Sequence, residues 1–216
     1  MLLALDVDGV VLDFDGFYGR LAYDNFGTTI QDKTAWNMDQ QYGLSKLQEK
    51  EIWSMINESN WTGLPVFDDT KQAVEIINQL QSKFNLEVIF VSSFNPKHFD
   101  GRFHDLQCAG FNLDKHQLIA CGTGNNSKLD FIKAEKIDWF VDDRITNLYD
   151  VSSISTHLIH VNRGYSEDGD NEKIQIMKQL HPRSLHSCSN FHSVNGLLDF
   201  VENILLDDIN LNLSLK

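Results

Sequence analysis

The sequence contains little cysteine, little proline and no long apolar run, and each shortage excludes a class of protein. Its three cysteines, Cys108, Cys121 and Cys188, form no CxxC pair, which argues against a disulfide framework and for a reducing compartment. Three prolines are too few for long disordered linkers. No apolar run approaches the length of a membrane span, and residues 1–12 lack the features of a signal peptide. We therefore expect a folded, cytoplasmic protein that spans no membrane.

Positive charge is also scarce. The 216 residues include 18 Lys and Arg against 31 Asp and Glu, which gives a formal net charge of −13. This charge repels polymeric nucleic acid and anionic membrane surfaces, so neither is an expected partner. A small phosphorylated substrate stays possible, because Lys side chains, backbone N–H groups and a metal ion act at short range, where salt screens distant charges. Nothing in the sequence indicates the oligomeric state.

Apolar runs typical of buried parallel strands recur along the chain. The first of them, residues 2–7, is interrupted only by Asp6. Segments with helical periodicity lie between the runs, and strands that alternate with helices indicate an α/β fold. We therefore predict a Rossmann-like core with a mostly parallel sheet. The further predicted strands are residues 86–91, 117–121, 139–141 and 157–161.

Capping residues mark the helices that lie between these strands. Asp69 is the expected N-cap of one helix, and Asn95 is the expected N-cap of the next, which Gly110 can end. Ser127 begins a third helix near the next motif. A last helix is predicted over residues 193–205, where apolar residues repeat at helical spacing.

One segment, residues 15–63, breaks the alternation of strands and helices. It has no buried-strand run, but it has helical stretches, many aromatic residues, and a capping-box pattern formed by Ser45 and Gln48. We interpret it as a small helical cap inserted after the first strand. The core then consists of residues 1–14 and 64–216.

Four groups of polar residues fall at the predicted carboxyl ends of strands or at a helix start. They are, in chain order, Asp6-Val-Asp8-Gly9-Val10, Ser92-Ser93, Lys128 and Asp142-Asp143. Ligands bind along the carboxyl edge of an open parallel sheet. Residues i and i+2 of an extended strand point the same way, so the two acids of the first group can share one site. Together the groups predict an acidic metal site beside a phosphate site.

These residue types suit phosphate chemistry that depends on a metal ion. A carboxylate such as Asp6 can attack phosphorus when Mg²⁺ neutralises the substrate oxygens. Asp8 can protonate the leaving oxygen and then deprotonate water. Mg²⁺ prefers oxygen ligands, and the candidates are Asp6, the backbone near Asp8, Asp142 and Asp143. The candidate phosphate contacts are Ser92, Ser93 and Lys128.

In this order the four groups resemble the four motifs of the haloacid dehalogenase superfamily of phosphohydrolases, over residues 2–145. The resemblance implies Asp6 as the nucleophile and Asp8 as the general acid and base. The phosphatase branch carries this second acid, and the dehalogenase branch does not. The other implied roles are phosphate binding by Ser92 and Lys128, and metal binding by Asp142 with Asp143.

A closer resemblance is to the 5'(3')-deoxyribonucleotidases. It is carried by Asp6-Val-Asp8-Gly9-Val10-Val11-Leu12-Asp13-Phe14, the Ser92-Ser93 pair, Val141-Asp142-Asp143-Arg144 and the helical segment after the first motif. Two positions depart from that family. Leu64-Pro65-Val66-Phe67 stands in place of Pro-Gly-Ala, and Phe94 stands in place of a Pro that often follows the serine pair. These two departures bear on which substrate is bound more than on which reaction is catalysed.

Aromatic residues in the predicted cap have two interpretations. Trp36, Trp53 and Trp61, with Phe17 and Tyr18, can form the core of the cap, which needs no ligand. Aromatic faces also suit stacking on nucleobases, and we take Trp36 as a candidate substrate contact.

Other interpretations of single motifs fit less well. An EF-hand fails because Val10-Val11-Leu12 follows Asp-x-Asp-Gly where metal ligands are needed. A phospho-receiver domain has its paired acids on the first strand, whereas here they come last. The run from Gly122 to Lys128 lacks the spacing of a phosphate-binding loop. A zinc pattern is matched by none of His181, His186, Cys188 and His192.

The sequence therefore predicts a Mg²⁺-dependent phosphatase that forms an aspartyl phosphate on Asp6, with (deoxy)nucleoside monophosphates as the favoured substrates. Three alternatives stay open. The substrate can be another small phosphomonoester, such as a sugar phosphate. The phosphoryl group can pass to an acceptor other than water. The fold can also serve as a non-catalytic binding protein.

Overall fold

A sheet of six parallel strands, in the order β3-β2-β1-β4-β5-β6, forms the centre of the molecule. The computed structural model describes residues 1–122, 127–154, 156–180 and 191–214. The α/β fold with a parallel sheet is confirmed, and β6 is a strand that the sequence analysis did not predict. The strands are β1 (Leu2–Leu5), β2 (Glu87–Ser92), β3 (Leu118–Ala120), β4 (Trp139–Asp142), β5 (His157–Val161) and β6 (Phe191–Val194).

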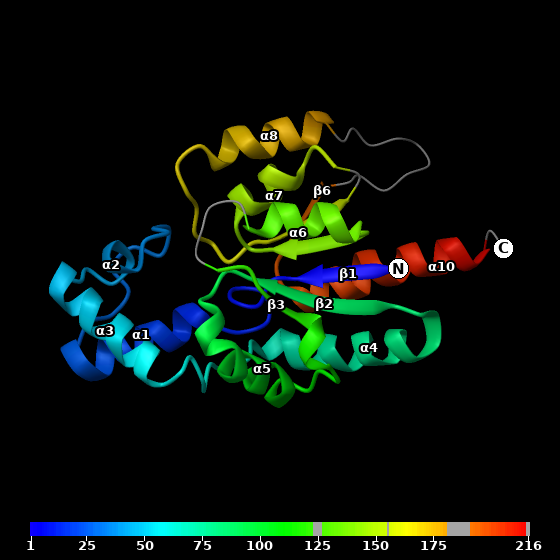
Figure 1. The fold of residues 1–216 in the computed structure, drawn as a ribbon. Helices are drawn as coiled ribbons and strands as arrows, with labels where there is room; N and C mark the ends of the chain where they lie inside the picture. The colour runs from blue at the N-terminus through cyan, green and yellow to red at the C-terminus, as the bar shows by residue number, and fades with distance from the viewer. Residues whose placement is uncertain (123–126, 155, 181–190, 215–216) are drawn as a thin grey trace.

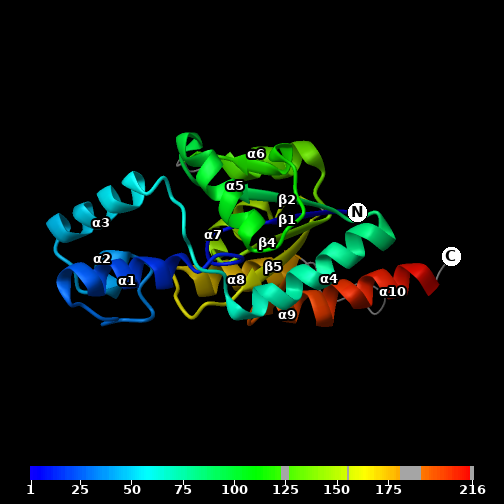
Figure 2. The same cartoon turned by 90° about the horizontal axis from the view of Figure 1, so that it is seen from below.

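The helices form two layers on the sheet and a separate group beside it (Figures 1 and 2). One face is covered by α6 (Ser127–Glu135), α7 (Ile145–Val151) and α8 (Asp170–Leu180). The other face is covered by α4 (Asp68–Phe84), α5 (Phe99–Cys108), α9 (Leu197–Phe200) and α10 (Leu206–Ser214). The group beside the sheet is α1 (Phe14–Phe26), α2 (Met38–Gln41) and α3 (Lys46–Glu58). Short 3-10 turns are η1 (Pro96–His98) and η2 (Lys115–Gln117), and η3 (Val201–Leu205) is a π-helix between α9 and α10.

Successive strand residues pack into two apolar clusters, one on each face of the sheet. In β1, Leu3 and Leu5 belong to the cluster that includes α4, whereas Ala4 belongs to the cluster that includes α6. All three side chains are fully buried. A parallel strand covered on both faces must be apolar at every position, which explains the continuous apolar runs in the sequence.

Capping side chains define several helix boundaries as predicted. Ser45 accepts a hydrogen bond from the backbone N–H of Gln48 and donates its own N–H to the Gln48 side chain. Asn95 accepts a hydrogen bond from the N–H of Lys97 in the turn before α5. Gly110 follows α5 with φ of +97°, the left-handed conformation in which helices often end.

Two predicted helix boundaries are wrong because tertiary contacts decide them. Asp69 lies within the first turn of α4, whose N-cap is Phe67, and its carboxylate accepts a hydrogen bond from the N–H of Leu198 at 3.4 Å. The helix predicted over residues 193–205 starts at Leu197, because its first residues belong to β6. Pairing of β6 with β5 at the sheet edge outweighs the helical periodicity of this segment.

The segment between β1 and α4 contains the three inserted helices, as predicted. The two connections that join it to the sheet lie side by side. Asp13 donates its backbone N–H to the carbonyl of Pro65 at 2.8 Å, and Leu12 forms an antiparallel bridge with Val66. The exact extent of a cap at residues 15–63 stays a prediction.

The structure describes only part of the predicted thiol and histidine positions. Cys108 and Cys121 form no disulfide within the described part of the chain, whereas His181, His186 and Cys188 lie outside it. Within the described ranges, no helix is long and apolar enough to cross a membrane.

Candidate active site at the carboxyl edge of the sheet

Three carboxylates meet where β1 and β4 end. Asp6 directly follows β1, Asp142 is the last residue of β4, and Asp143 comes next. One oxygen from each carboxylate lies within 4.8 Å of the others, and all three residues are buried. The strand order changes direction between these two strands. The crevice at such a point is the usual ligand site of an open α/β sheet.

Lys128, in the first turn of α6, places an ammonium group against this cluster. Its Nζ lies 2.7 Å from Asp6 Oδ2 and 2.8 Å from Asp142 Oδ2. Burial alone would lower the pKa of Lys128, but the carboxylates of Asp142 and Asp6 raise it, so the side chain stays charged. Asp142 also accepts hydrogen bonds from the backbone N–H of Arg144 and the side-chain amide of Asn147. Asp142 is therefore held from several sides.

One ammonium group does not balance three buried carboxylates. Burial raises the pKa of Asp6 to about 7, although Lys128 opposes this rise. Burial and the charges of Asp142 and Asp6 raise the pKa of Asp143 well above its usual value. The excess negative charge suits a divalent cation, and hard carboxylate oxygens are the ligands that Mg²⁺ prefers. The residues of this cluster therefore fit a bound Mg²⁺.

Asp8 is paired with an arginine from another element. Nη2 of Arg102, in α5, lies 2.7 Å from each carboxylate oxygen of Asp8. Arg102 is fully buried, and its guanidinium carbon lies 4.8 Å from the centroid of the Trp61 ring. Burial raises the pKa of Asp8, and the guanidinium of Arg102 opposes this rise. A carboxyl group whose pKa is raised above its usual value holds a proton more readily, which suits it to both giving and taking a proton.

The turn after Asp8 is held by the loop that follows β5. Gly9 has φ of +78°, and a Cβ at this position would collide with the Asp143 carboxylate and the Tyr165 hydroxyl. The Tyr165 hydroxyl donates a hydrogen bond to Asp143, and Arg163 Nε donates to the carbonyl oxygen of Gly9 at 2.6 Å. The turn thus requires glycine both for its backbone conformation and for space.

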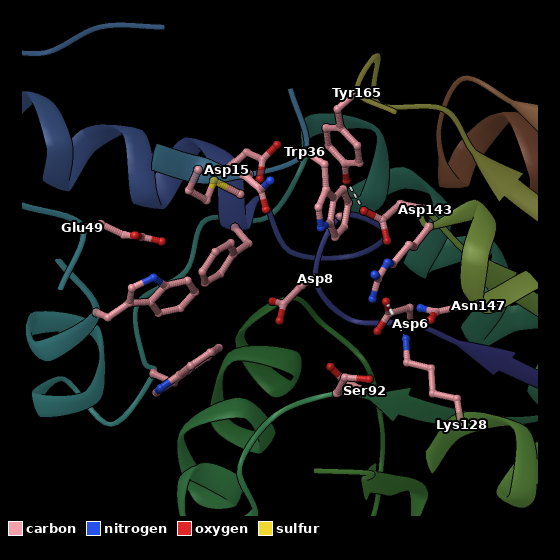
Figure 3. A pocket seen from close by; sticks show the side chains of 18 residues that line it. Asp6, Asp8, Asp15, Trp36, Glu49, Ser92, Lys128, Asp143, Asn147 and Tyr165 are labelled. Carbon is pink, nitrogen blue, oxygen red and sulfur yellow. Dashed lines mark hydrogen bonds and ion pairs between the residues drawn. The ribbon is translucent and has the colours of Figure 1, made fainter. Parts of the chain in front are cut away.

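The carboxylates open into a cavity of about 360 Å³ that extends to the inserted helices (Figure 3). The end of the cavity beside these carboxylates contains Ser92, the buried last residue of β2, and the exposed Ser93. Asp142 is fully buried beside Lys128 and does not line the cavity. The other sequence-predicted site residues all line it, namely Asp6, Asp8, Ser92, Ser93, Lys128, Asp143 and Trp36. Their individual roles stay predictions.

Trp36 lies at the side of the cavity next to Asp143 and Tyr165 (Figure 3). Its ring is 5.1 Å from that of Tyr165, edge to face, and the guanidinium carbon of Arg144 lies 5.1 Å from its centroid. Arg144 in turn pairs with Glu167 at 2.7 Å. Trp36 therefore belongs to a network that joins the inserted segment to the loop after β5.

A second aromatic group, Phe14, Trp53 and Trp61, lines the cavity at the inserted helices. The three ring centroids lie 5.7 to 6.0 Å apart, and Trp61 also stacks on His98 at 5.6 Å. These rings hold α1 and α3 together, as the packing interpretation expected. They also present apolar surface to whatever occupies the cavity.

Several residues at the site were missed by the sequence analysis. Arg102 lies in a helix that was examined only for its apolar face, and nothing in the sequence marks it as the partner of Asp8. Tyr165 follows β5 at the same sheet edge as the four motifs, and this position could have identified it. Asp15 and Glu49 also line the cavity, but each is an acidic residue in the first turn of a helix, where acidic residues are common without a function.

The fold is similar to that of solved hydrolases, although the sequence matches no family model and no curated protein. A haloacid dehalogenase-like family hydrolase from Xanthomonas campestris gives a TM-score of 0.53 at 8% identity, covering 100% of this chain and 98% of its own. A predicted phosphoglycolate phosphatase from Haemophilus somnus 129pt gives 0.53 at 11% identity, covering 93% and 96%. A hydrolase from Pseudomonas syringae gives 0.52 at 12% identity, covering 97% and 99%.

At these identities the similarity establishes the fold alone, and nothing in it indicates the 5'(3')-deoxyribonucleotidase subgroup. The similarity covers the six-stranded parallel sheet and the helices inserted after β1. The acidic cluster lies at the carboxyl edge of this sheet. The chain has the haloacid dehalogenase-like hydrolase fold, with a buried cluster of Asp6, Asp142 and Asp143 that could bind a metal ion.

Proposed function

We propose that the protein is a Mg²⁺-dependent phosphatase that hydrolyses small phosphate monoesters through an aspartyl phosphate on Asp6. The main support for this proposal is the buried cluster that Asp6 forms with Lys128, Asp142 and Asp143 at the edge of the sheet. This arrangement places a carboxylate nucleophile between an ammonium group and a site for a divalent cation. Bound Mg²⁺ would neutralise phosphate oxygens and stabilise the charge that develops during in-line displacement.

In the first half-reaction, a carboxylate oxygen of Asp6 attacks the phosphorus atom. The bond between phosphorus and the ester oxygen breaks, and the ester oxygen takes a proton from Asp8 as it leaves. Lys128 keeps Asp6 in place and adds positive charge beside the phosphate. Ser92, at the end of β2, lines the same part of the cavity and can donate its hydroxyl to a phosphate oxygen.

In the second half-reaction, water loses a proton to Asp8 and attacks the same phosphorus atom. The bond from phosphorus to Asp6 breaks, which releases inorganic phosphate and restores the carboxylate. Asp8 must therefore reach both the leaving oxygen and the incoming water, and Arg102 holds its carboxylate at the cavity wall for both steps.

The proposal is tested first at Asp6. Asp6→Asn keeps the size of the side chain but removes the nucleophile, so turnover should fall by about 10⁴-fold or more. Phosphate release measures turnover, and circular dichroism checks the fold. Trapping with beryllium fluoride should place the adduct on Asp6. Near-normal turnover by Asp6→Asn would rule out the covalent mechanism.

For the substrate, we propose (deoxy)nucleoside monophosphates, with residues 15–63 acting as a cap over them. The support is the aromatic lining of the cavity, which includes Trp36 beside Asp143 and a second group at the inserted helices, because aromatic faces suit nucleobases. If Trp36 contacts the base, Trp36→Ala should lower kcat/KM for a nucleotide roughly tenfold to a hundredfold more than for a small aryl phosphate. Equal losses on both substrates would mean that Trp36 only holds the inserted segment in place, and the proposal would then reduce to a phosphatase of unknown substrate.

A further inference from the structure

The basic side chains that line the cavity gather at one end, beside the clustered carboxylates, and the charged side chains at the other end are carboxylates alone. Among the described residues that line it, the basic side chains are Lys128 and Arg144, and both lie beside the Asp142-Asp143 motif. The inserted helices contribute carboxylates instead, Asp15 from α1 and Glu49 from α3. In Figure 3, Asp15 and Glu49 lie on the opposite side of the cavity from Lys128 and Ser92. A substrate that spans the cavity therefore meets Lys128, Arg144 and the carboxylates that would hold Mg²⁺ at one end, and carboxylates without a basic neighbour in the cavity lining at the other.

At the catalytic end, which is the end beside the clustered carboxylates, each basic side chain is already paired with a carboxylate. Lys128 offsets part of the charge on the three clustered carboxylates, and the remainder suits the Mg²⁺ of the proposed function. Asp8 is paired with the buried Arg102, and Arg144 is paired with Glu167. The catalytic end can therefore accept a phosphate group, but it leaves no strong cation to neutralise a second anionic group on the substrate.

Asp15 and Glu49 mark the outer end of the cavity, and basic side chains neutralise little of their negative charge. Within the described part of the chain, Asp15 has no ion-pair partner, and burial beside Asp13 raises its pKa to about 6. Glu49 pairs with Lys46 at 3.0 Å, but this ammonium is exposed to solvent and also pairs with Asp39 at 2.5 Å. Lys46 therefore serves two carboxylates, and the outer end keeps a negative charge next to apolar rings.

We infer that the outer end of the cavity binds a nitrogen-bearing leaving group, which presents N–H donors or a positive charge to Asp15 and Glu49. This inference rests on the proposed phosphatase function and narrows its substrate class. Hydrogen bonds from such donors to carboxylates are stronger than neutral ones, and partial exclusion of water strengthens them further. A leaving group with a carboxylate or a second phosphate would meet like charge and is disfavoured.

Two kinds of leaving group share this chemistry. An amino-substituted nucleobase has N–H donors on a flat ring, which also suits the walls formed by Phe14, Trp53 and Trp61. An alkyl ammonium group carries a full positive charge, which carboxylates attract and aromatic faces accept. Both place nitrogen at one end of the substrate and phosphate at the other, as the charge pattern of the cavity requires.

Two matched pairs of esters test the inference with the intact protein and Mg²⁺. Adenosine 5'-monophosphate and purine riboside 5'-monophosphate differ only in the exocyclic amino group. 2-Aminoethyl phosphate and propyl phosphate have similar size but differ in charge. We expect the nitrogen-bearing member of at least one pair to have a kcat/KM roughly tenfold to a hundredfold higher, the effect of one hydrogen bond to a charged group. The pair that shows the preference identifies the leaving group.

Variants of the two carboxylates connect the preference to the outer end of the cavity. Glu49→Gln and Asp15→Asn should each reduce the ratio of the two kcat/KM values within the preferred pair. Glu51→Gln is the matched control, because Glu51 is exposed on the same helix and does not line the cavity. It should keep the ratio of the unmodified protein.

The possible outcomes separate this inference from the proposed function. Hydrolysis of all four esters without preference in either pair overturns the inference and leaves the phosphatase proposal standing. A preference that survives in both Glu49→Gln and Asp15→Asn also overturns it, because the selection then arises elsewhere. Failure to hydrolyse any of the four overturns the proposed function, and the inference fails with it.

Discussion

The catalytic end and the outer end of the cavity are built in different ways. At the catalytic end, Asp6 and Asp142 are fixed by two adjacent strands, and their carboxylates are buried and held by Lys128. At the outer end, Asp15 and Glu49 come from separate helices of the inserted segment and are only half-buried. Strand ends are placed by the hydrogen bonds of the sheet, whereas the inserted helices are placed by side-chain packing. We therefore expect chemistry to depend on the first region and substrate choice on the second.

Removal of the proposed Mg²⁺ should have the largest effect, because it would leave the clustered carboxylates of the catalytic end uncompensated. Excess chelator should stop phosphate release, and Mg²⁺ should restore it. Mg²⁺ should also raise the melting temperature by several degrees, since a ligand that binds only the folded state stabilises it. Asp143→Asn should weaken this thermal response, and Asp24→Asn, at an exposed position on α1, should not. Undiminished hydrolysis in excess chelator would contradict the assignment.

The pair of Arg102 and Asp8 should be the next most sensitive feature. Arg102→Met leaves the Asp8 carboxylate without its buried partner, which we expect to cost about 2–3 kcal/mol of unfolding free energy, less than for a fully buried pair because Asp8 is partly exposed. Turnover of an alkyl phosphate should fall more than that of a phenyl ester with a good leaving group, because the latter needs less help from Asp8. Urea unfolding and steady-state kinetics measure the two effects.

An exposed ion pair provides the control for Arg102. Lys115 pairs with Asp100 at 2.6 Å, and both side chains are largely exposed. Lys115→Met should therefore change the unfolding free energy by less than about 1 kcal/mol. A cost for Arg102→Met as small as this would mean that the buried pair does not hold Asp8.

Alanine substitutions at two glycines with positive φ distinguish the cost of backbone strain from the cost of a steric collision at the site. Gly9→Ala, at the catalytic end, meets both an unfavourable φ of +78° and a collision with Asp143. Gly27→Ala, after α1, has φ of +66° but open space around the new Cβ. The second change should cost about 1 kcal/mol, typical of alanine forced into the left-handed region. The first should cost roughly 1–3 kcal/mol more, the range expected of overpacking. Equal costs in thermal unfolding would show that Asp143 moves freely.

The smallest effect is expected from Asp15 at the outer end, and it should depend on pH. The pKa of this carboxyl is raised by burial to about 6 in the folded protein, against an ordinary value of 3.8. Ionisation is therefore harder in the folded state, so this group costs stability as the pH rises from about 4 to about 6. Asp15→Asn should then be more stable than the unmodified protein at pH 7.5, by about 1 kcal/mol after allowance for partial exposure. The gain should disappear below pH 4.

Unfolding at several pH values measures this difference, and Asp24→Asn on the same helix is the control. A gain for Asp15→Asn that is the same at pH 3.5 and pH 7.5 would show that the charge of Asp15 is not its cause.

Errors in the sequence analysis share one cause, the influence of residues distant in the chain. The helical period of residues 193–205 is real, yet the first of these residues pair as β6 with β5. Asp69 has the chemistry of an N-cap, but the backbone N–H that it binds belongs to Leu198 in another element. Intrinsic helix preferences amount to less than about 1 kcal/mol per residue, so a new strand pairing or a tertiary hydrogen bond can outweigh them.

The sequence by itself determined the α/β class, most strand positions, the inserted helices and the order of the polar motifs. These features depend on periodicity and on neighbouring residues, because a strand buried on both faces must be apolar and a motif at its end must reach the sheet edge. Only the tertiary structure decided that Arg102 pairs with Asp8, 94 positions away, and that Asp15 and Glu49 face the same cavity as Lys128. The partner of a buried charge and the electrostatic field inside a cavity both depend on which helices pack together. No local pattern in the chain specifies that packing.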